Sequence, residues 1–119
     1  INFTPRFRNH WINYYFLKDY QDKLLFAGLE KERLDFCNKW LLDIPLLETS
    51  DFYELAVAMN SCKFFMSNQT AFFQIAENLK IPRLLETCPT LAHVIPMGKN
   101  GFDHYNQQCC EFYFKKLIK

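Results

Sequence analysis

Residues 63–86, KFFMSNQTAFFQIAENLKIPRLLE, decide the fold class of this chain. The apolar run at 63–66 is short enough for a buried strand, and it ends at the hydroxyl and amide side chains of residues 67–70. Residues 71–79 return to helical periodicity, and after Pro82 a second short apolar run covers residues 83–85. Strand, helix and strand in this order predict two parallel strands joined by a right-handed crossover.

The same alternation continues on both sides of this unit. Short apolar runs at 2–4, 23–27 and 44–47 precede it, and 94–96 is a candidate for a sixth strand. Helical patterns occupy 11–18, 30–40 and 105–117. Either Ser50 or Asp51, with Glu54 in the first turn, can cap a further helix that runs through Met59. We therefore predict a Rossmann-like α/β fold: a doubly wound, mostly parallel sheet of five or six strands with helices on both faces.

Length and composition limit the function classes. The 119 residues, half of them hydrophobic, suffice for one domain that spans residues 1–119. Because the chain starts at Ile1 and residues 2–4 are already typical of a strand, we expect it to be a piece of a longer protein. The 14 basic and 13 acidic residues give a net charge of +1, which argues against a nucleic-acid partner. No apolar run approaches the roughly 20 residues of a membrane span, so we expect no transmembrane segment.

The cysteines indicate a reducing compartment. Their number, five, is odd and their spacing is irregular, so we predict free thiols and a cytoplasmic protein. Neither the cysteines nor the histidines have metal-ligand spacing, so we predict no metal and no cofactor.

Residues that directly follow predicted strands are the candidates for a site, because ligands of open parallel sheets bind at the carboxyl ends of the strands. The turn at 67–70 presents hydroxyls and amides at the start of a helix, where a phosphate can bind, although helix capping alone also favours such residues. Arg6 and Arg8 follow the first strand and are spaced to clamp a diphosphate, the alternative being exposed surface charges. The predicted donor-phosphate set is Thr4, Arg6, Arg8, Ser67, Asn68, Gln69 and Thr70.

A second candidate group follows the strand at 83–85. Glu86 stands where an acidic side chain accepts hydrogen bonds from a ribose in dinucleotide-binding folds. An ion pair at the surface with Arg83 or Lys80 is the alternative explanation of this carboxylate. We predict that Glu86 and Thr87 contact the nucleoside.

One stretch of the chain resembles a known family. The segments DFYELA at 51–56, CKFFMSNQTA at 62–71, Ala76-Glu77 and PRLLE at 82–86 are similar to B-type glycosyltransferases, which have two Rossmann domains, and in particular to the heptosyltransferase-like group. The resemblance implies the C-terminal, donor-binding half, with residues 67–70 at the donor diphosphate and Glu86 near the nucleoside. The pattern departs at Asn68-Gln69, where heptosyltransferases favour a glycine-containing turn.

The resemblance implies that the chain binds a nucleoside-diphosphate sugar as donor. The catalytic base and the acceptor site of such enzymes usually belong to an N-terminal domain of the same protein, so no catalytic residue is assigned here. An alternative function is a non-catalytic α/β interaction domain degenerate from such an enzyme, with the 18% aromatic residues serving a partner surface. A third, a flavodoxin-like module for another phosphate ligand, is also open.

Overall fold

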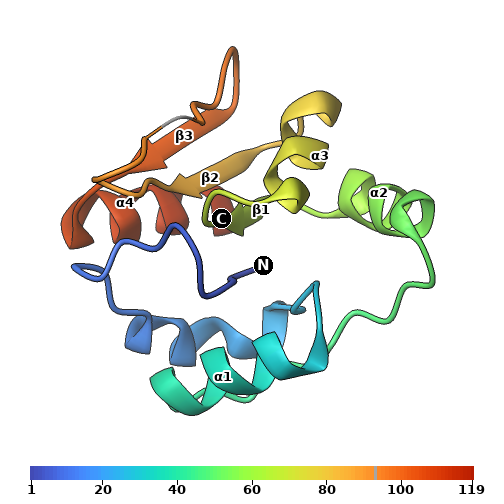
Figure 1. Ribbon diagram of the computed structural model, residues 1–119, viewed down its shortest axis with the longest axis horizontal. Coiled ribbons are helices and arrows are strands. Elements are labelled where there is room, and N and C mark those ends of the chain that lie inside the picture. Colours follow the sequence, from blue (N-terminus) through green and yellow to red (C-terminus); the bar gives the residue numbers. More distant parts are fainter. Residues whose placement is uncertain (93) are drawn as a thin grey trace.

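The computed structural model describes residues 1–92 and 94–119. In this part of the chain the elements follow one another as in Figure 1. They are the 3-10 helix η1 (Tyr15–Lys23), α1 (Glu30–Trp40), α2 (Phe52–Ser61), β1 (Phe65–Ser67), α3 (Ala71–Leu79), β2 (Arg83–Glu86), β3 (Gly101–His104) and α4 (Gln107–Ile118).

The three strands form one parallel sheet in the order β1-β2-β3. In its register Phe65 pairs with Arg83, and Arg83 pairs in turn with Gly101. A helix connects β1 to β2, as residues 63–86 predict, and all three strands point the same way. The carboxyl ends of the strands therefore lie at one edge of the sheet.

The prediction of five or six strands is wrong, since the described residues form three. Residues 2–4, 23–27 and 44–47 run parallel beside the sheet but contribute only the single bridges Asn2–Ser67 and Phe26–Leu46. Backbone bonds link them in series, from Asn2 N to Met66 O (3.0 Å) and from Ala27 N to Ile1 O (2.7 Å). Pro5 directly follows the first of these runs and Pro45 lies within the third, and because proline lacks an N–H, no ladder extends along either run.

The last strand lies at 101–104 and not at 94–96. Residues 94–96 end in Pro96, and Arg83 N donates instead to Asn100 O (2.9 Å), which places Gly101 next to β2. A Cβ atom at Gly101 would lie 2.7 Å from the guanidinium of Arg83, so only glycine fits there.

The helices agree better with their patterns. The predicted spans of α1 and α3 are confirmed, and Asp51 caps α2 by accepting from Glu54 N (2.8 Å). α4 begins two residues later than expected, at an Asn106 cap. The helix expected at 11–18 is a 3-10 helix at 15–23 instead, because Asn9 accepts from Trp11 N (3.0 Å) and holds the preceding segment in a turn.

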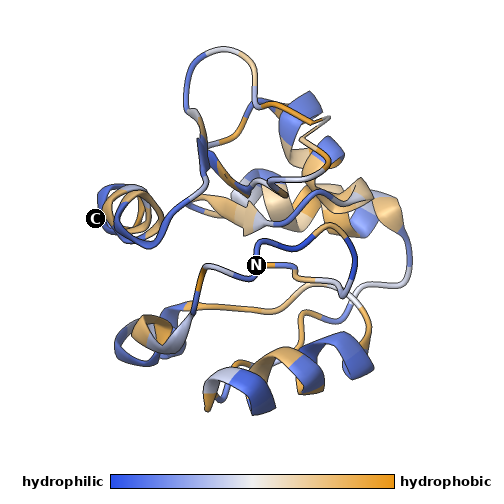
Figure 2. Ribbon diagram, turned by 60° about the vertical axis from the view of Figure 1, so that its left-hand side comes forward, coloured by the Kyte–Doolittle hydropathy of each residue, from blue (hydrophilic) through white to orange (hydrophobic). Residues whose placement is uncertain are grey.

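Helices cover both faces of the sheet. Met66 and Leu84 face a large core that includes side chains of η1, α1 and α4, whereas Phe65 faces a smaller core with α2 and α3. Neighbouring residues of a strand point to opposite faces, so these cores lie on either side of the sheet. Figure 2 shows many of the hydrophobic residues in the middle of the molecule, on the sheet and on the segments around it.

Arg83 is a fully buried basic side chain in the middle of this architecture. It is 0% exposed, and its Nε donates to Glu77 Oε1 of α3 at 2.8 Å. The rest of the guanidinium donates to the backbone oxygens of Ile81, Met97 and Lys99. Arg83 therefore ties β2 to α3 and to the loop before β3.

Replacing Arg83 by Met should lower the free energy of unfolding by about 3 to 5 kcal/mol, because it removes a buried donor from three backbone carbonyls and one of the two basic partners of Glu77. Chemical denaturation measures this change. Lys80→Met is the matched control: Lys80 pairs with the same Glu77, but its side chain is 56% exposed, and its loss should cost less than about 1 kcal/mol. Equal effects of the two substitutions would contradict the anchoring role of Arg83.

Candidate functional site

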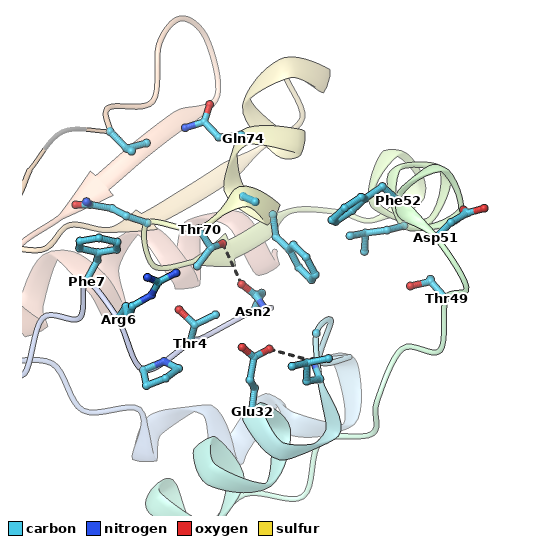
Figure 3. A pocket seen from close by; sticks show the side chains of 18 of the residues that line it. Asn2, Thr4, Arg6, Phe7, Glu32, Thr49, Asp51, Phe52, Thr70 and Gln74 are labelled. Atoms are coloured by element: carbon cyan, nitrogen blue, oxygen red, sulfur yellow. Dashed lines mark hydrogen bonds between the residues drawn. The ribbon is translucent and has the colours of Figure 1, made fainter.

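A cavity of about 1000 Å³ opens at the carboxyl end of β1 (Figure 3). Its walls come from the loop at residues 4–7 and from the starts of α1, α2 and α3. These segments are far apart in the sequence, and the parallel arrangement brings them to one edge of the sheet. We call this cavity the switch pocket.

The N-termini of three helices reach the switch pocket. The residues before the first turn of α1, α2 and α3 are Leu29, Asp51 and Thr70, and all three line the cavity. The start of a helix carries a positive partial charge and N–H groups without a partner inside the helix. Carboxylates already cap two of these starts, since Glu32 accepts from Leu29 N at 3.0 Å and Asp51 accepts from Glu54 N at 2.8 Å. The start of α3, capped by the neutral Thr70 hydroxyl, is therefore the one best suited to an anion.

Arg6 supplies the basic side chain of the pocket lining. It is exposed, and Figure 3 shows its guanidinium beside Thr70 at the start of α3. Among the described residues it takes part in none of the ion pairs, and it lies 5.9 Å from the ring centre of Phe7. Glu32 and Asp51 place carboxylates in other parts of the lining.

The floor of the pocket depends on a glycine. Gly28 has φ of +136°, and a Cβ atom there would lie 2.7 Å from Glu32 Oε1 and 2.8 Å from Asn2 Nδ2. The Asn2 amide donates to Ala27 O at 2.7 Å and accepts from the Thr70 hydroxyl at 3.0 Å. Asn2 thus joins the segment at 23–27 to the start of α3 beneath the cavity.

The structure brings part of the predicted phosphate set together. Thr4, Arg6, Gln69 and Thr70 line the switch pocket. Thr70 also caps α3, accepting from Phe73 N at 3.4 Å, so the capping explanation holds for this residue as well. The side chain of Gln69 is turned to the chain at 88–91, where it donates to Leu91 O and accepts from Cys88 N.

Ser67 and Asn68 lie beneath the pocket and do not line it. Both are 0% exposed. The Ser67 hydroxyl donates to Asn68 O at 2.8 Å, and the Asn68 amide bonds to the loop at 4–6. Their polar groups support the site from within the protein.

Arg8 and Glu86 form a buried ion pair away from the pocket lining. Arg8 Nε lies 2.8 Å from Glu86 Oε1, and the two side chains are 13% and 0% exposed. Glu86 also accepts from Asn9 N at 2.7 Å and from the Tyr14 hydroxyl at 2.5 Å. Burial, together with this carboxylate, raises the pKa of Tyr14 well above its ordinary value. Arg8 therefore neither lines the pocket with Arg6, as the predicted diphosphate clamp requires, nor forms the exposed surface charge of the alternative. Glu86 pairs with neither Arg83 nor Lys80.

Thr87 is buried next to this ion pair. It is 1% exposed, and its backbone N–H donates to His104 O at 3.1 Å. Neither Thr87 nor Glu86 belongs to the lining of the switch pocket. The structure thus separates both residues predicted for the nucleoside from the four predicted phosphate residues in the lining, whereas Arg8 of the phosphate set pairs with Glu86.

Replacing Glu86 by Gln should lower the free energy of unfolding by about 3 kcal/mol, because it leaves the buried Arg8 charge without its counter-charge. Nucleotide affinity of the folded fraction should not change, since the side chain lies outside the pocket. Denaturation and ligand titration of the same sample measure both quantities. Glu30→Gln, at an exposed ion pair with Arg33, is the control and should cost under about 0.5 kcal/mol. A loss of affinity without a loss of stability would restore Glu86 as a ligand contact.

His104 is a second titratable group in this buried region. It is 2% exposed, and neither ring nitrogen has a hydrogen-bond partner among the described residues. Burial lowers the pKa of His104 from 6.5 to about 4, and the neighbouring carboxylate of Glu86 opposes this shift only in part. The folded protein therefore holds this ring neutral.

A histidine whose pKa is lower in the folded state takes up its proton more readily in the unfolded state. The stability that neutral His104 contributes is present above pH 6.5 and is lost as the pH falls towards about 4. The loss should reach about 3 kcal/mol. His104→Leu should flatten this pH dependence in denaturation experiments, whereas replacing the exposed His10 by Gln should leave it as it is. An unchanged slope in His104→Leu would refute the assignment.

Several residues of the pocket are absent from the set predicted from the sequence. Asn2, Glu32, Thr49, Asp51 and Phe52 line it, although only the residues after the first, fourth and fifth predicted strands entered the candidate set. Each missed residue lies in or just after a predicted strand or near the start of a predicted helix. A candidate set with the start of every predicted helix at the carboxyl edge of the sheet would have contained most of these residues.

Other kinds of site find little support in the described part of the chain. No group of three or more His, Cys, Asp or Glu side chains there is arranged to hold a metal ion, and His93 lies outside the described residues. All five cysteines are described, and each is a free thiol. Within the same residues, no helix has the length and apolar character needed to cross a membrane.

Comparisons of the chain with protein-family models, with curated proteins and with solved structures find no match. Its function is therefore inferred from the switch pocket and the residues around it.

Proposed function

We propose that this chain binds a nucleoside-diphosphate sugar in the switch pocket, as the donor-binding half of a glycosyltransferase. The observation that carries the proposal is the convergence of three helix N-termini and Arg6 on one cavity of about 1000 Å³. A volume of this size accommodates a ligand larger than a single phosphate.

The order of the parallel segments supports this function. Hydrogen bonds connect the segment at 44–47 to that at 23–27, then residues 1–3, β1, β2 and β3. In chain order this series is 3-2-1-4-5-6, as in Rossmann-like folds, and it reverses direction between residues 1–3 and β1. We propose that the chain is a Rossmann-like domain in which three segments keep the position of strands without forming ladders.

Ligands of such folds bind in the crevice where the strand order reverses. The loop at residues 4–7 and the turn at 68–70 flank this point, and both contribute to the pocket lining. A donor diphosphate would lie between Arg6 and the first turn of α3. The carboxylates of Glu32 and Asp51 suit hydroxyl groups of the sugar or ribose, because an ionised carboxylate accepts hydrogen bonds.

The strength of these interactions indicates weak binding. The helix dipole contributes about 0.3 to 1 kcal/mol and each charge-assisted hydrogen bond of Arg6 about 1.5 to 3 kcal/mol. Ordering the ligand and the exposed side chains offsets several kcal/mol of this sum. We expect a dissociation constant in the high micromolar to millimolar range, about –4 to –6 kcal/mol.

The chemistry of the complete enzyme would be displacement of a nucleoside diphosphate from the sugar. The positive helix ends and Arg6 would stabilise the negative charge of the departing diphosphate. The acceptor site and the catalytic base are proposed to belong to an N-terminal domain of the same protein. The donor and that domain are the two proposed partners.

A non-catalytic interaction domain is the second candidate function. Several aromatic side chains lie at the surface, among them Trp11, Tyr53 and Phe112, which are 72%, 76% and 64% exposed. Exposed aromatics of this size are enriched at protein interfaces. The position of Arg8 in a buried ion pair, which leaves one arginine at the pocket, also favours this alternative over the clamp of two arginines.

Titration of the chain with ADP, GDP and UDP by NMR distinguishes the two functions. Arg6→Ala should weaken binding of the preferred nucleotide at least about tenfold, because it removes charge-assisted bonds. Lys18→Ala removes the same charge from an exposed site outside the pocket and should leave the affinity unchanged. If none of the three nucleotides binds the folded chain at millimolar concentration, the donor function is wrong and the interaction domain replaces it.

A further inference from the structure

The side chain of Asn68 connects the end of β1 to the loop that carries Arg6. Its Oδ1 accepts from Thr4 N at 3.1 Å. Its Nδ2 donates to Arg6 O at 2.6 Å and to the Thr4 hydroxyl at 3.1 Å. One buried amide thus holds both ends of the segment at 4–6.

This segment leads into an unfavourable backbone conformation. Phe7 has φ of +56°, in the left-handed region that residues other than glycine seldom adopt. Such a conformation costs about 1 to 2 kcal/mol and persists only where the surroundings impose it. The bond from Asn68 to Arg6 O fixes the peptide group directly before Phe7. If this bond is lost, we expect the backbone at Phe7 to leave the left-handed region and the loop at 4–7 to change its conformation.

The buried position of Asn68 limits what the side chain can do itself. It is 0% exposed, it does not line the switch pocket, and both polar atoms of its amide have partners in the loop. A ligand in the pocket would meet Thr4 and Arg6 instead, which lie in the lining.

We propose that Asn68 is a positioning residue of the diphosphate site: it holds the loop at 4–7 so that the Arg6 guanidinium faces the start of α3, and it does not contact the ligand. This inference rests on the proposed function of the switch pocket. It assigns to Asn68 a role through Arg6, where the resemblance implied direct contact with the donor diphosphate.

A double-mutant cycle between Asn68 and Arg6 tests the role. Asn68→Ser shortens the side chain so that it no longer reaches Arg6 O. If Asn68 acts through Arg6, this substitution should weaken nucleotide binding about tenfold in the unaltered chain and less than about twofold when Arg6 is already Ala. NMR titration with whichever of ADP, GDP and UDP binds best measures all four affinities.

Asn9→Ser is the matched control. Asn9 is also a buried amide, 1% exposed, and it donates to Thr87 O and Tyr105 O outside the pocket. The Asn9→Ser variant should lose stability, as Asn68→Ser does, but should keep the nucleotide affinity of the unaltered chain. Losses of affinity that add in the cycle would mean that Asn68 contacts the ligand, and equal losses in Asn9→Ser would mean a general effect of stability. Either result overturns the positioning role.

Proteolysis gives a second measurement that needs no ligand. Trypsin cleaves after Arg6. Loss of the bonds from Asn68 to the loop at 4–6 should accelerate this cleavage, while cleavage after Lys18 stays unchanged. Should Asn68→Ser fail to fold, Asn68→Asp keeps the acceptor for Thr4 N, loses the donor for Arg6 O and should show the same acceleration. Unchanged cleavage at Arg6 overturns the positioning role alone. Absence of nucleotide binding by the unaltered chain overturns the proposed function and, with it, the role of Asn68 in that site.

Discussion

The carboxylate of Glu86, buried at the end of β2, accepts hydrogen bonds from Arg8, from Asn9 N and from the Tyr14 hydroxyl. These donors belong to the N-terminal segment, 78 residues away from Glu86 in the case of Arg8. The contact holds residues 8–14 against the sheet edge, and the loop at 4–7 directly before them forms a wall of the switch pocket. The bonds of Glu86 therefore stabilise the fold around the pocket wall, although Glu86 itself does not line the pocket.

The sequence predicts the local elements of this fold better than their pairing. α1 and α3 follow from apolar periodicity and from caps, which depend on residues close in the chain. Whether an apolar run becomes a strand depends on a neighbour that can bond along its length. The runs at 2–4 and 44–47 have the right composition, but each meets its neighbour at one bridge. Nothing in a run of four or five residues reveals this difference.

The site is predictable in part for the same reason. Residues at the ends of parallel strands meet because of the topology, and Arg6 and Thr70 lie together as the strand–helix pattern predicts. The choice between ligand and structural partner depends on distant residues. Arg8 resembles Arg6 in the sequence, but a buried carboxylate faces it. Asn68 suits a phosphate-binding turn equally well, but its side-chain amide donates to the backbone of the loop at 4–6.

Arg83 holds the loop before β3 through backbone oxygens, those of Met97 and Lys99, and not through side chains of the loop. Every residue type has a carbonyl oxygen, so this anchor sets no demand on the side chains at 97 and 99, both of which are exposed. Residues 97 and 99 can therefore vary without loss of these bonds, whereas Gly98 and Asn100 have φ of +85° and +67°, which favours glycine and asparagine there. The anchor itself restricts the residue type at Arg83 and at Gly101, where a side chain would displace the guanidinium.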